Sequence, residues 1–153
     1  MQDLNDLYQE VILDHNRRPR NYGPLPDATH TAKGHNPLCG DKLTLALKIE
    51  GDRITGVSFE GSGCAISKAS ASLMTDALKG RSLAEAGLLF DRFHQMITSS
   101  FDRPIDEEGL EALGKLAAFA GVREFPIRVK CASLAWHTLK AALSDSHQMV
   151  KTE

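Results

Sequence analysis

The stretch LTLALKIEGDRITGVSF, residues 43–59, decides the fold of this 153-residue chain. In its first half, leucine or isoleucine occupies every second position from 43 to 49, with threonine, alanine and lysine between them. This alternation is typical of a strand with one buried face. The glycine within residues 50–52 marks a turn, and residues 54–59 have the composition of a second strand. The stretch therefore predicts an antiparallel hairpin.

The segments around the hairpin carry helical periodicity or turn signals. Before the hairpin they predict a helix that begins near Leu4 and ends before Pro19, a loop over 19–26 and a short strand over 30–36. After it they predict a helix from Cys64 to the glycine at 80, a helix opened by a capping box of Ser82 and Glu85, and a loop over 98–104. The remaining segments predict a helix containing residues 110–120, a last helix that starts near Cys131, and a frayed end over 149–153. Because the strands come first and most helices follow, we expect an α+β fold, with helices packed on one face of a small three-stranded antiparallel sheet. The length fits a single domain over residues 1–153.

Composition excludes several classes of protein. Hydrophobic residues make up 42% of the chain and charged residues 25%, as in ordinary globular proteins. A net charge of -2 leaves no basic surface for nucleic acid. No apolar run reaches the roughly 20 residues of a membrane span, and the acidic, amphipathic start does not resemble a signal peptide. The odd number of cysteines then favours a reducing compartment, so we expect a cytoplasmic protein with no membrane partner.

The three cysteines stand where the chain changes structure. Cys39 precedes the first strand of the hairpin, Cys64 lies where the second strand gives way to a helix, and Cys131 lies near the start of the last helix. A thiol at a helix N-terminus is favoured as thiolate, the form that binds metals and attacks sulfur. Asp41 adds a carboxylate two residues after Cys39. Three sulfurs and one carboxylate can complete a tetrahedral zinc site.

The spacing alone leaves another interpretation open. Free cysteine is among the most buried residue types and often acts as a small hydrophobe. The chain has no C-x-x-C pair, and the distances between its cysteines match no zinc-finger pattern. His35, four residues before Cys39, could reach a metal, although a polar loop histidine is the better interpretation.

Three segments resemble the cysteine motifs of the iron–sulfur cluster assembly family typified by IscU and the N-terminal domain of NifU. They are NPLCGD at 36–41, FEGSGCAIS at 59–67 and RVKCASLAW at 128–136, and the residues DH at 14–15 and RPRN at 18–21 resemble the N-terminal loop of the family. Lys130 stands where IscU-type proteins have histidine, and an extra helical segment covers residues 102–121. Both departures resemble the SufU branch of the family.

The resemblance implies a zinc-dependent sulfurtransferase that takes persulfide sulfur from a SufS-type cysteine desulfurase for iron–sulfur cluster assembly. Cys39, Asp41, Cys64 and Cys131 would then bind one zinc ion per chain, and Cys39 would accept the sulfur. Arg128 either steadies the anionic site or is solvated, and residues 17–20 either contact the partner or form a solvated loop. Other cluster assembly proteins are possible further partners.

Two other functions remain open. The same four residues could assemble a transient iron–sulfur cluster for transfer to apo-proteins, because thiolates also hold such clusters; Lys130 argues against this scaffold function. Alternatively, zinc only holds the fold together. A papain-type Cys–His enzyme fits poorly, since the cysteines lack the local signature of that family.

Overall fold

The computed structural model describes residues 4–99, 107–144 and 149–151. Its elements, in chain order, are α1 (Leu4–Arg17), β1 (His30–Asn36), β2 (Asp41–Glu50), β3 (Arg53–Ser62), α2 (Ala65–Leu78), α3 (Leu83–Thr98), α4 (Glu107–Leu113), the 3-10 helix η1 (Gly114–Glu124), α5 (Pro126–Leu143) and β4 (Met149–Lys151). The predicted hairpin is therefore β2 and β3, and the predicted short strand is β1. The loop expected over 98–104 lies mostly outside the described residues.

The strands form one sheet in the order β3-β2-β1-β4. β2 pairs antiparallel with both β1 and β3, which confirms the predicted three-stranded antiparallel sheet. β4 adds a short fourth strand, parallel to β1, with Met149 opposite Lys33. The expectation that residues 149–151 fray was wrong. Their pairing uses main-chain groups on the free edge of β1, and local sequence carries no signal for such a contact.

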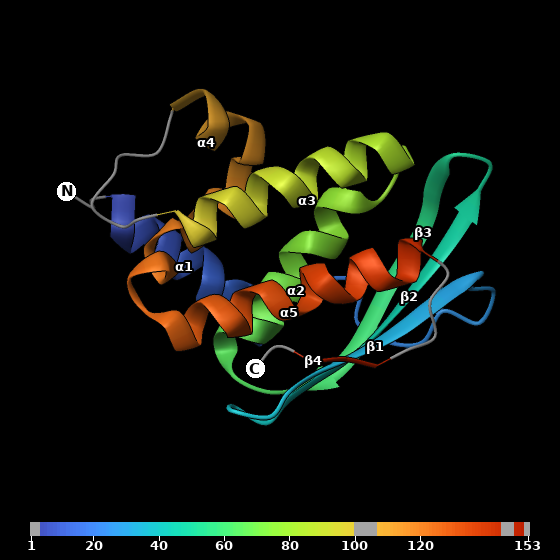
Figure 1. Ribbon diagram of the computed structural model, residues 1–153, viewed down its shortest axis with the longest axis horizontal. Helices are drawn as coiled ribbons and strands as arrows, with labels where there is room; N and C mark the ends of the chain where they lie inside the picture. Colours follow the sequence, from blue (N-terminus) through green and yellow to red (C-terminus); the bar gives the residue numbers. More distant parts are fainter. Residues whose placement is uncertain (1–3, 100–106, 145–148, 152–153) are drawn as a thin grey trace.

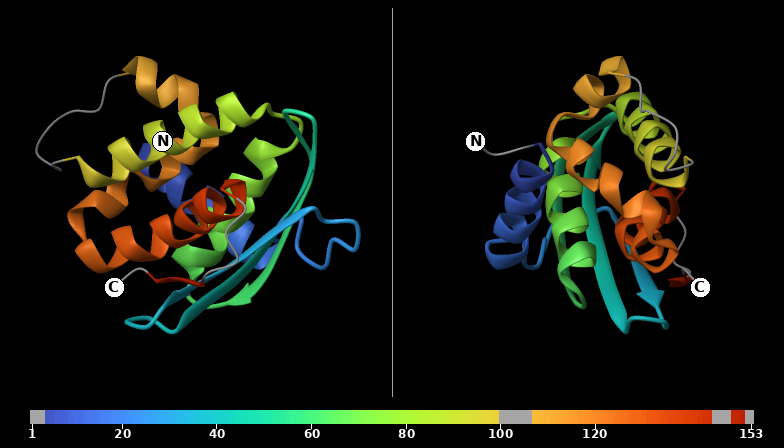
Figure 2. Two further views of the ribbon diagram at one scale, coloured as in Figure 1. Left: turned by 45° about the vertical axis from the view of Figure 1, so that its right-hand side comes forward. Right: turned by 90° about the vertical axis from the view of Figure 1, so that its left-hand side faces the viewer.

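The helices lie together on one side of the sheet, as predicted (Figures 1 and 2). Alternate residues of β2 point into this layer, and Leu45 and Leu47 are fully buried. Across the core, the rings of Phe93 on α3 and Trp136 on α5 stack with their centroids 4.5 Å apart. Burying such large apolar side chains is the main force that holds helices against a sheet.

The loop predicted over 19–26 covers the outer edge of β3. The Gly23 N–H donates to the Phe59 carbonyl at 2.9 Å, and the Phe59 N–H donates to the Asn21 carbonyl at 3.0 Å. The Tyr22 ring meets the Phe59 ring edge-on. The loop thus pairs with the outer edge of β3, as β4 pairs with the outer edge of β1, and such pairing limits edge-to-edge association.

Two helices differ from their predicted form. α5 begins at Pro126, so the prediction of a start near Cys131 was wrong, and Cys131 lies in the second turn. Proline is well suited to the first position of a helix, where its missing N–H has no partner to lose. The helix predicted to contain residues 110–120 is α only as far as Leu113. Gly114 then adopts a positive φ of 58°, and the chain continues as η1.

α1 is attached to α2 through a buried histidine. His15 is 2% exposed, and its Nδ1 lies 2.7 Å from the Ser72 hydroxyl. The Arg20 backbone N–H donates to the same hydroxyl at 2.8 Å. Burial, and next the positive charge of Arg20, lower the pKa of His15 below its usual range.

This burial makes stability depend on pH. Below about pH 6.5 the unfolded chain takes up a proton that folded His15 resists, so stability falls as the pH drops toward the folded-state pKa. We expect His15→Gln to remove the contribution of His15 to the slope of the unfolding free energy against pH, which is at most about 1.4 kcal/mol per pH unit. Urea unfolding between pH 7 and 5 measures it. Burial also lowers the pKa of His137, so the difference between wild type and variant is the relevant quantity. Identical slopes would contradict the assignment to His15.

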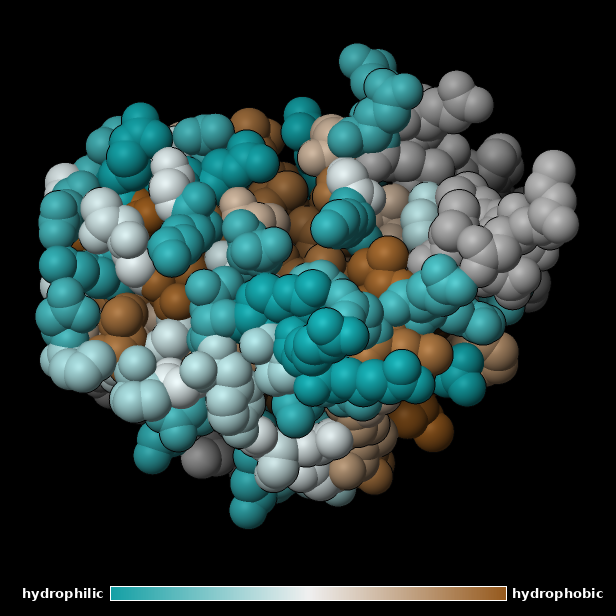
Figure 3. Space-filling model, turned by 180° about the vertical axis from the view of Figure 1, so that it is seen from behind, coloured by the Kyte–Doolittle hydropathy of each residue, from teal (hydrophilic) through white to brown (hydrophobic). Residues whose placement is uncertain are grey.

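No helix within the described ranges is long and apolar enough to cross a membrane. Seen from behind, the surface is mostly hydrophilic, and apolar side chains are exposed in several places between the polar ones (Figure 3).

Candidate metal centre

Cys39 lies in the short loop that joins β1 to β2. Asn36, the last residue of β1, pairs with Asp41, the first residue of β2, so residues 37–40 form a hairpin loop. The Cys39 N–H donates to the Asn36 carbonyl at 3.3 Å, and Gly40 supplies the positive φ of 71° that the turn needs. The thiol is partly exposed.

Cys64 caps the N-terminus of α2, which confirms its predicted place between strand and helix. Its backbone is extended, and its Sγ accepts the Ser67 N–H at 3.4 Å. A sulfur in this position lies at the positive end of the helix dipole.

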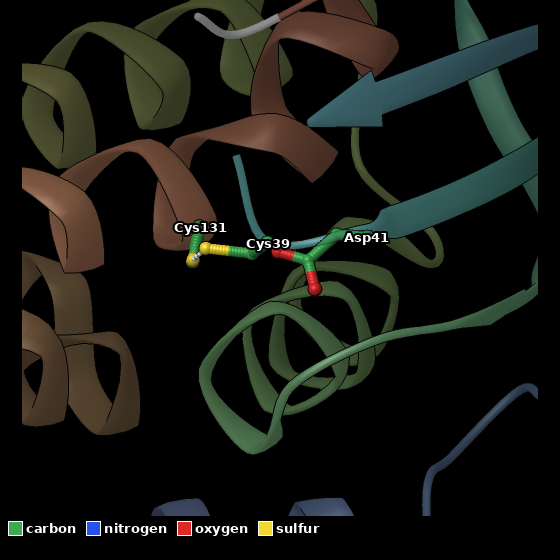
Figure 4. Close-up of side chains that lie close together, drawn as sticks. All are labelled: Cys39, Asp41 and Cys131. Atoms are coloured by element: carbon green, nitrogen blue, oxygen red, sulfur yellow. Dashed lines mark hydrogen bonds between the residues drawn. The ribbon is translucent and has the colours of Figure 1, made fainter. Parts of the chain in front are cut away.

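Cys131 on α5 contacts Cys39 in the loop between β1 and β2. The two Sγ atoms lie 3.2 Å apart, and Cys131 is 3% exposed (Figure 4). One ligand atom from each of Cys39, Asp41 and Cys131 lies within 4.8 Å of the others. Three residues that the sequence proposed as ligands therefore form one group.

Asp41 connects the fourth proposed residue to this group. It is fully buried, its Oδ1 accepts the Cys64 backbone N–H at 2.8 Å, and its Oδ2 lies 3.7 Å from the Cys64 Sγ. All four residues thus lie close together. Cys64 contacts Asp41, but it is not one of the three residues whose ligand atoms all lie within 4.8 Å of one another. All three cysteines are free thiols.

The donor set fits zinc. Zinc binds sulfur at about 2.3 Å and carboxylate oxygen at about 2.0–2.2 Å, so tetrahedral donors stand roughly 3.3–3.8 Å apart. The Cys39–Cys131 and Asp41–Cys64 separations are close to this range. Burial, and next the neighbouring Cys39 thiol, hold the pKa of the Cys131 thiol above its usual range. A bound cation would offset both effects, because it favours the thiolate.

Two other predicted candidates lie away from the group. His35 occupies the position before buried Asn36 on β1, and successive strand residues face opposite sides, so it faces away from the helices. Arg128 is exposed, and its guanidinium lies 4.4 Å from the centre of the Phe125 ring. Of the two roles considered for Arg128, the solvated one agrees with this position.

Two residues of the site, Asn36 and Gly63, were not predicted from the sequence to have a role. Asn36 lies in the first cysteine motif and Gly63 in the second, so their positions next to cysteines were the available signal. Asn36 donates from its amide to the Cys131 Sγ at 3.7 Å. Gly63 lies so close to Asp41 that a Cβ atom would overlap the carboxylate.

A groove of about 650 Å³ is lined in part by sequence neighbours of Cys64 and Cys131. Its lining includes Ala65 and Ile66, directly after Cys64, and Arg128, one turn before Cys131. The other walls come from α1, η1 and Phe125. Leu38, next to Cys39, is 60% exposed.

The comparisons with known proteins identify the family. The sequence profile of the NifU-like N terminal domain matches residues 7–132. A *Streptococcus pyogenes* protein named iron-sulfur cluster assembly scaffold protein IscU is 43% identical, over 94% of this chain and 86% of its own length. The zinc-dependent sulfurtransferase SufU of *Bacillus subtilis* is 41% identical, over 93% of this chain and 92% of its own length. The chain belongs to the NifU-like N terminal domain family, which confirms the resemblance noted from the cysteine motifs.

A solved structure agrees with this assignment. A crystal structure from *Fervidobacterium islandicum*, described provisionally as an iron-sulfur cluster assembly scaffold protein for the SUF system, superposes with a TM-score of 0.79. It is 34% identical, and the match covers 92% of this chain and 99% of that one. The predicted IscU/SufU-like fold is thereby confirmed.

Gly63 provides a test of the position of Asp41. We expect Gly63→Ala to displace the carboxylate or β3, to cost about 1–3 kcal/mol of stability and to weaken zinc binding. Gly51→Ala is the matched control, because Gly51 also has a positive φ but has open space where a Cβ atom would lie. It should cost about 1–2 kcal/mol from backbone strain and leave zinc binding unchanged. Thermal melts and chelator competition measure both quantities, and equal zinc affinity in the two variants would contradict the contact.

Proposed function

We propose that the protein is a zinc-dependent sulfurtransferase that accepts persulfide sulfur for iron–sulfur cluster assembly. The observation that carries the proposal is the group of Cys39, Asp41 and Cys131, with Cys64 attached through Asp41. Two of the thiols are fixed on helices, and the third lies in a loop. The 41% identity to a relative named zinc-dependent sulfurtransferase supports the same function.

The residues divide into fixed and movable donors. Cys64 is the N-cap of α2, and Cys131 is buried inside α5, so moving either would disturb a packed helix. Cys39 sits in a loop of four residues and is partly exposed. Cys39 is therefore the thiol best able to turn toward a partner.

The proposed transfer is a thiol exchange. The donor is the persulfide of a SufS-type cysteine desulfurase. The Cys39 thiolate attacks the outer sulfur of this persulfide, a new S–S bond forms on Cys39, and the old S–S bond breaks. The desulfurase cysteine leaves as a thiolate, so charge and electrons balance without an oxidant. Zinc, when bound, would keep the thiolates deprotonated without redox chemistry of its own.

The surroundings of Cys39 suit a protein partner. Leu38 offers an exposed apolar side chain beside the acceptor, and the groove at Ala65 and Arg128 offers a concave surface. Leu13 and Phe125, which line the groove, are also exposed, and exposed apolar residues grouped in this way are typical of interfaces. We propose that the desulfurase docks over this surface.

The function is tested with desulfurase, free cysteine and the protein with or without zinc. We expect the zinc-loaded protein to increase alanine formation, and the metal-free protein to lose this effect. Zinc restored to the metal-free protein should restore the effect, which controls for damage during metal removal. Equal stimulation by the metal-free protein would contradict zinc-dependent transfer.

A scaffold function is the second candidate. It is favoured by the 43% identity to a relative named as a scaffold, and by thiolates that also suit iron–sulfur clusters. Under this function, iron and sulfide should produce visible cluster absorption that transfers to an apo-protein, with no requirement for zinc. If zinc removal lowers only the melting temperature, zinc has a structural role alone.

A further inference from the structure

Asn36 is a fully buried polar residue at the base of the Cys39 loop. It ends β1 and lies directly opposite Asp41 in the sheet. Opposed residues of an antiparallel pair point to the same face, so both side chains enter the helical layer. Burying an amide costs free energy unless both of its ends are hydrogen-bonded, so its partners indicate why it is there.

Both ends of the Asn36 amide are used at the candidate metal centre. Its Oδ1 accepts the Leu38 N–H at 3.2 Å, which closes the turn that carries Cys39. Its Nδ2 donates to the Cys131 Sγ at 3.7 Å, a distance suited to a sulfur acceptor. One side chain thus contacts both the loop of the movable thiol and the sulfur of a fixed one.

Asp41 makes the corresponding contact with the other helix. It accepts the backbone N–H of Cys64 at the start of α2, while Asn36 contacts Cys131 on α5. The paired ends of β1 and β2 therefore contact α2 near Cys64 and α5 at Cys131. The four-residue loop beyond this base carries Cys39.

We propose that Asn36 is a positioning residue for sulfur transfer: its amide N–H holds the Cys131 sulfur in place while Cys39 leaves the group. This inference rests on the proposed function. Hydrogen bonds from residues behind the ligands orient metal-binding groups and tune metal affinity. An N–H donor to a thiolate also stabilises its negative charge inside a buried site. Asn36 supplies such a donor and carries no charge of its own.

Two substitutions separate the effect of the N–H donor to Cys131 from the effect of the acceptor that closes the turn. Asn36→Asp has nearly the same shape and keeps the acceptor for the Leu38 N–H, but it loses the donor and adds a charge. Asn36→Leu loses donor and acceptor without adding a charge. The matched control is Asn21→Asp, because the Asn21 amide donates to the Thr75 hydroxyl on α2, which lies outside the cysteine group.

We expect Asn36→Asp and Asn36→Leu to lower zinc affinity by about 10- to 100-fold in competition with a coloured chelator. In the cobalt-substituted proteins, the sulfur-to-metal charge-transfer bands should move to longer wavelength, because a sulfur without its N–H donor gives up electrons more easily. Asn21→Asp should change neither quantity. Zinc affinity within twofold of wild type and unchanged bands in both Asn36 variants would overturn the proposal.

A measurement on the wild type covers the case in which the variants do not fold. In protein loaded with a magnetically active cadmium isotope, nuclear magnetic resonance should detect coupling between the metal and an Asn36 side-chain amide proton. A bound metal without this coupling would contradict the contact. None of these readouts uses a desulfurase. Failure of the wild type to stimulate a desulfurase would therefore overturn the proposed function and leave the Asn36 contact to be judged separately.

Discussion

Cys131→Ser is expected to bind zinc roughly 100-fold more weakly than the wild type. Zinc binding to structural thiolate sites contributes about 10–16 kcal/mol of free energy, so the loss of one of four ligands costs about 3 kcal/mol. Cys131 is buried against the Cys39 sulfur, and a serine hydroxyl does not ionise there to replace a thiolate. Elemental analysis and chelator competition measure the loss.

Ser133→Ala is the control for Cys131→Ser. Ser133 is a buried polar residue on the same helix, and its hydroxyl donates to the Lys130 carbonyl. This variant should retain zinc. If Cys131→Ser and Cys64→Ser both retain zinc as fully as wild type, the proposed ligand set is wrong.

Cys39→Ser is expected to keep the fold and abolish stimulation of the desulfurase. Removing a nucleophile typically lowers a rate by a factor on the order of 10³ or more. The loss of stability should be small, because Cys39 lies in a loop and its thiol caps no helix of the described residues. Alanine formation and a thermal melt measure the two effects.

The zinc content of Cys39→Ser and Cys64→Ser identifies the reason for any loss of stimulation, because both residues are proposed ligands. Cys64→Ser should weaken zinc binding and disturb the N-cap of α2, whereas Cys39→Ser should leave α2 intact. Stimulation that survives in Cys39→Ser would exclude Cys39 as the acceptor.

Local sequence patterns predicted most of the fold. The period of two in residues 43–49 and the capping box of Ser82 and Glu85 both describe contacts between near neighbours, and both were confirmed. β4 was missed because its pairing with β1 joins distant parts of the chain. The start of α5 was missed because its first turn is mostly exposed and carries no apolar stripe, although Pro126 marks it.

The candidate site could be predicted only as a set of residues. The spacing of Cys39, Cys64 and Cys131 does not require a shared site, and the family resemblance suggested one. Their convergence depends on the β2–β3 register, which places Asp41 beside the start of α2. The contact of Asn36 with Cys131 depends on the β1–β2 register and on the packing of α5. Neither can be read from local periodicity.

Single-turnover sulfur mapping tests the central claim most directly. The zinc-loaded and metal-free proteins would each be mixed briefly with a desulfurase that already carries its persulfide, and then digested for mass spectrometry. We predict the added mass of one sulfur atom on the Cys39 peptide of the zinc-loaded protein, and none on the metal-free protein. Sulfur found mainly on Cys64 or Cys131, or equally on Cys39 with and without zinc, would contradict zinc-dependent transfer to Cys39.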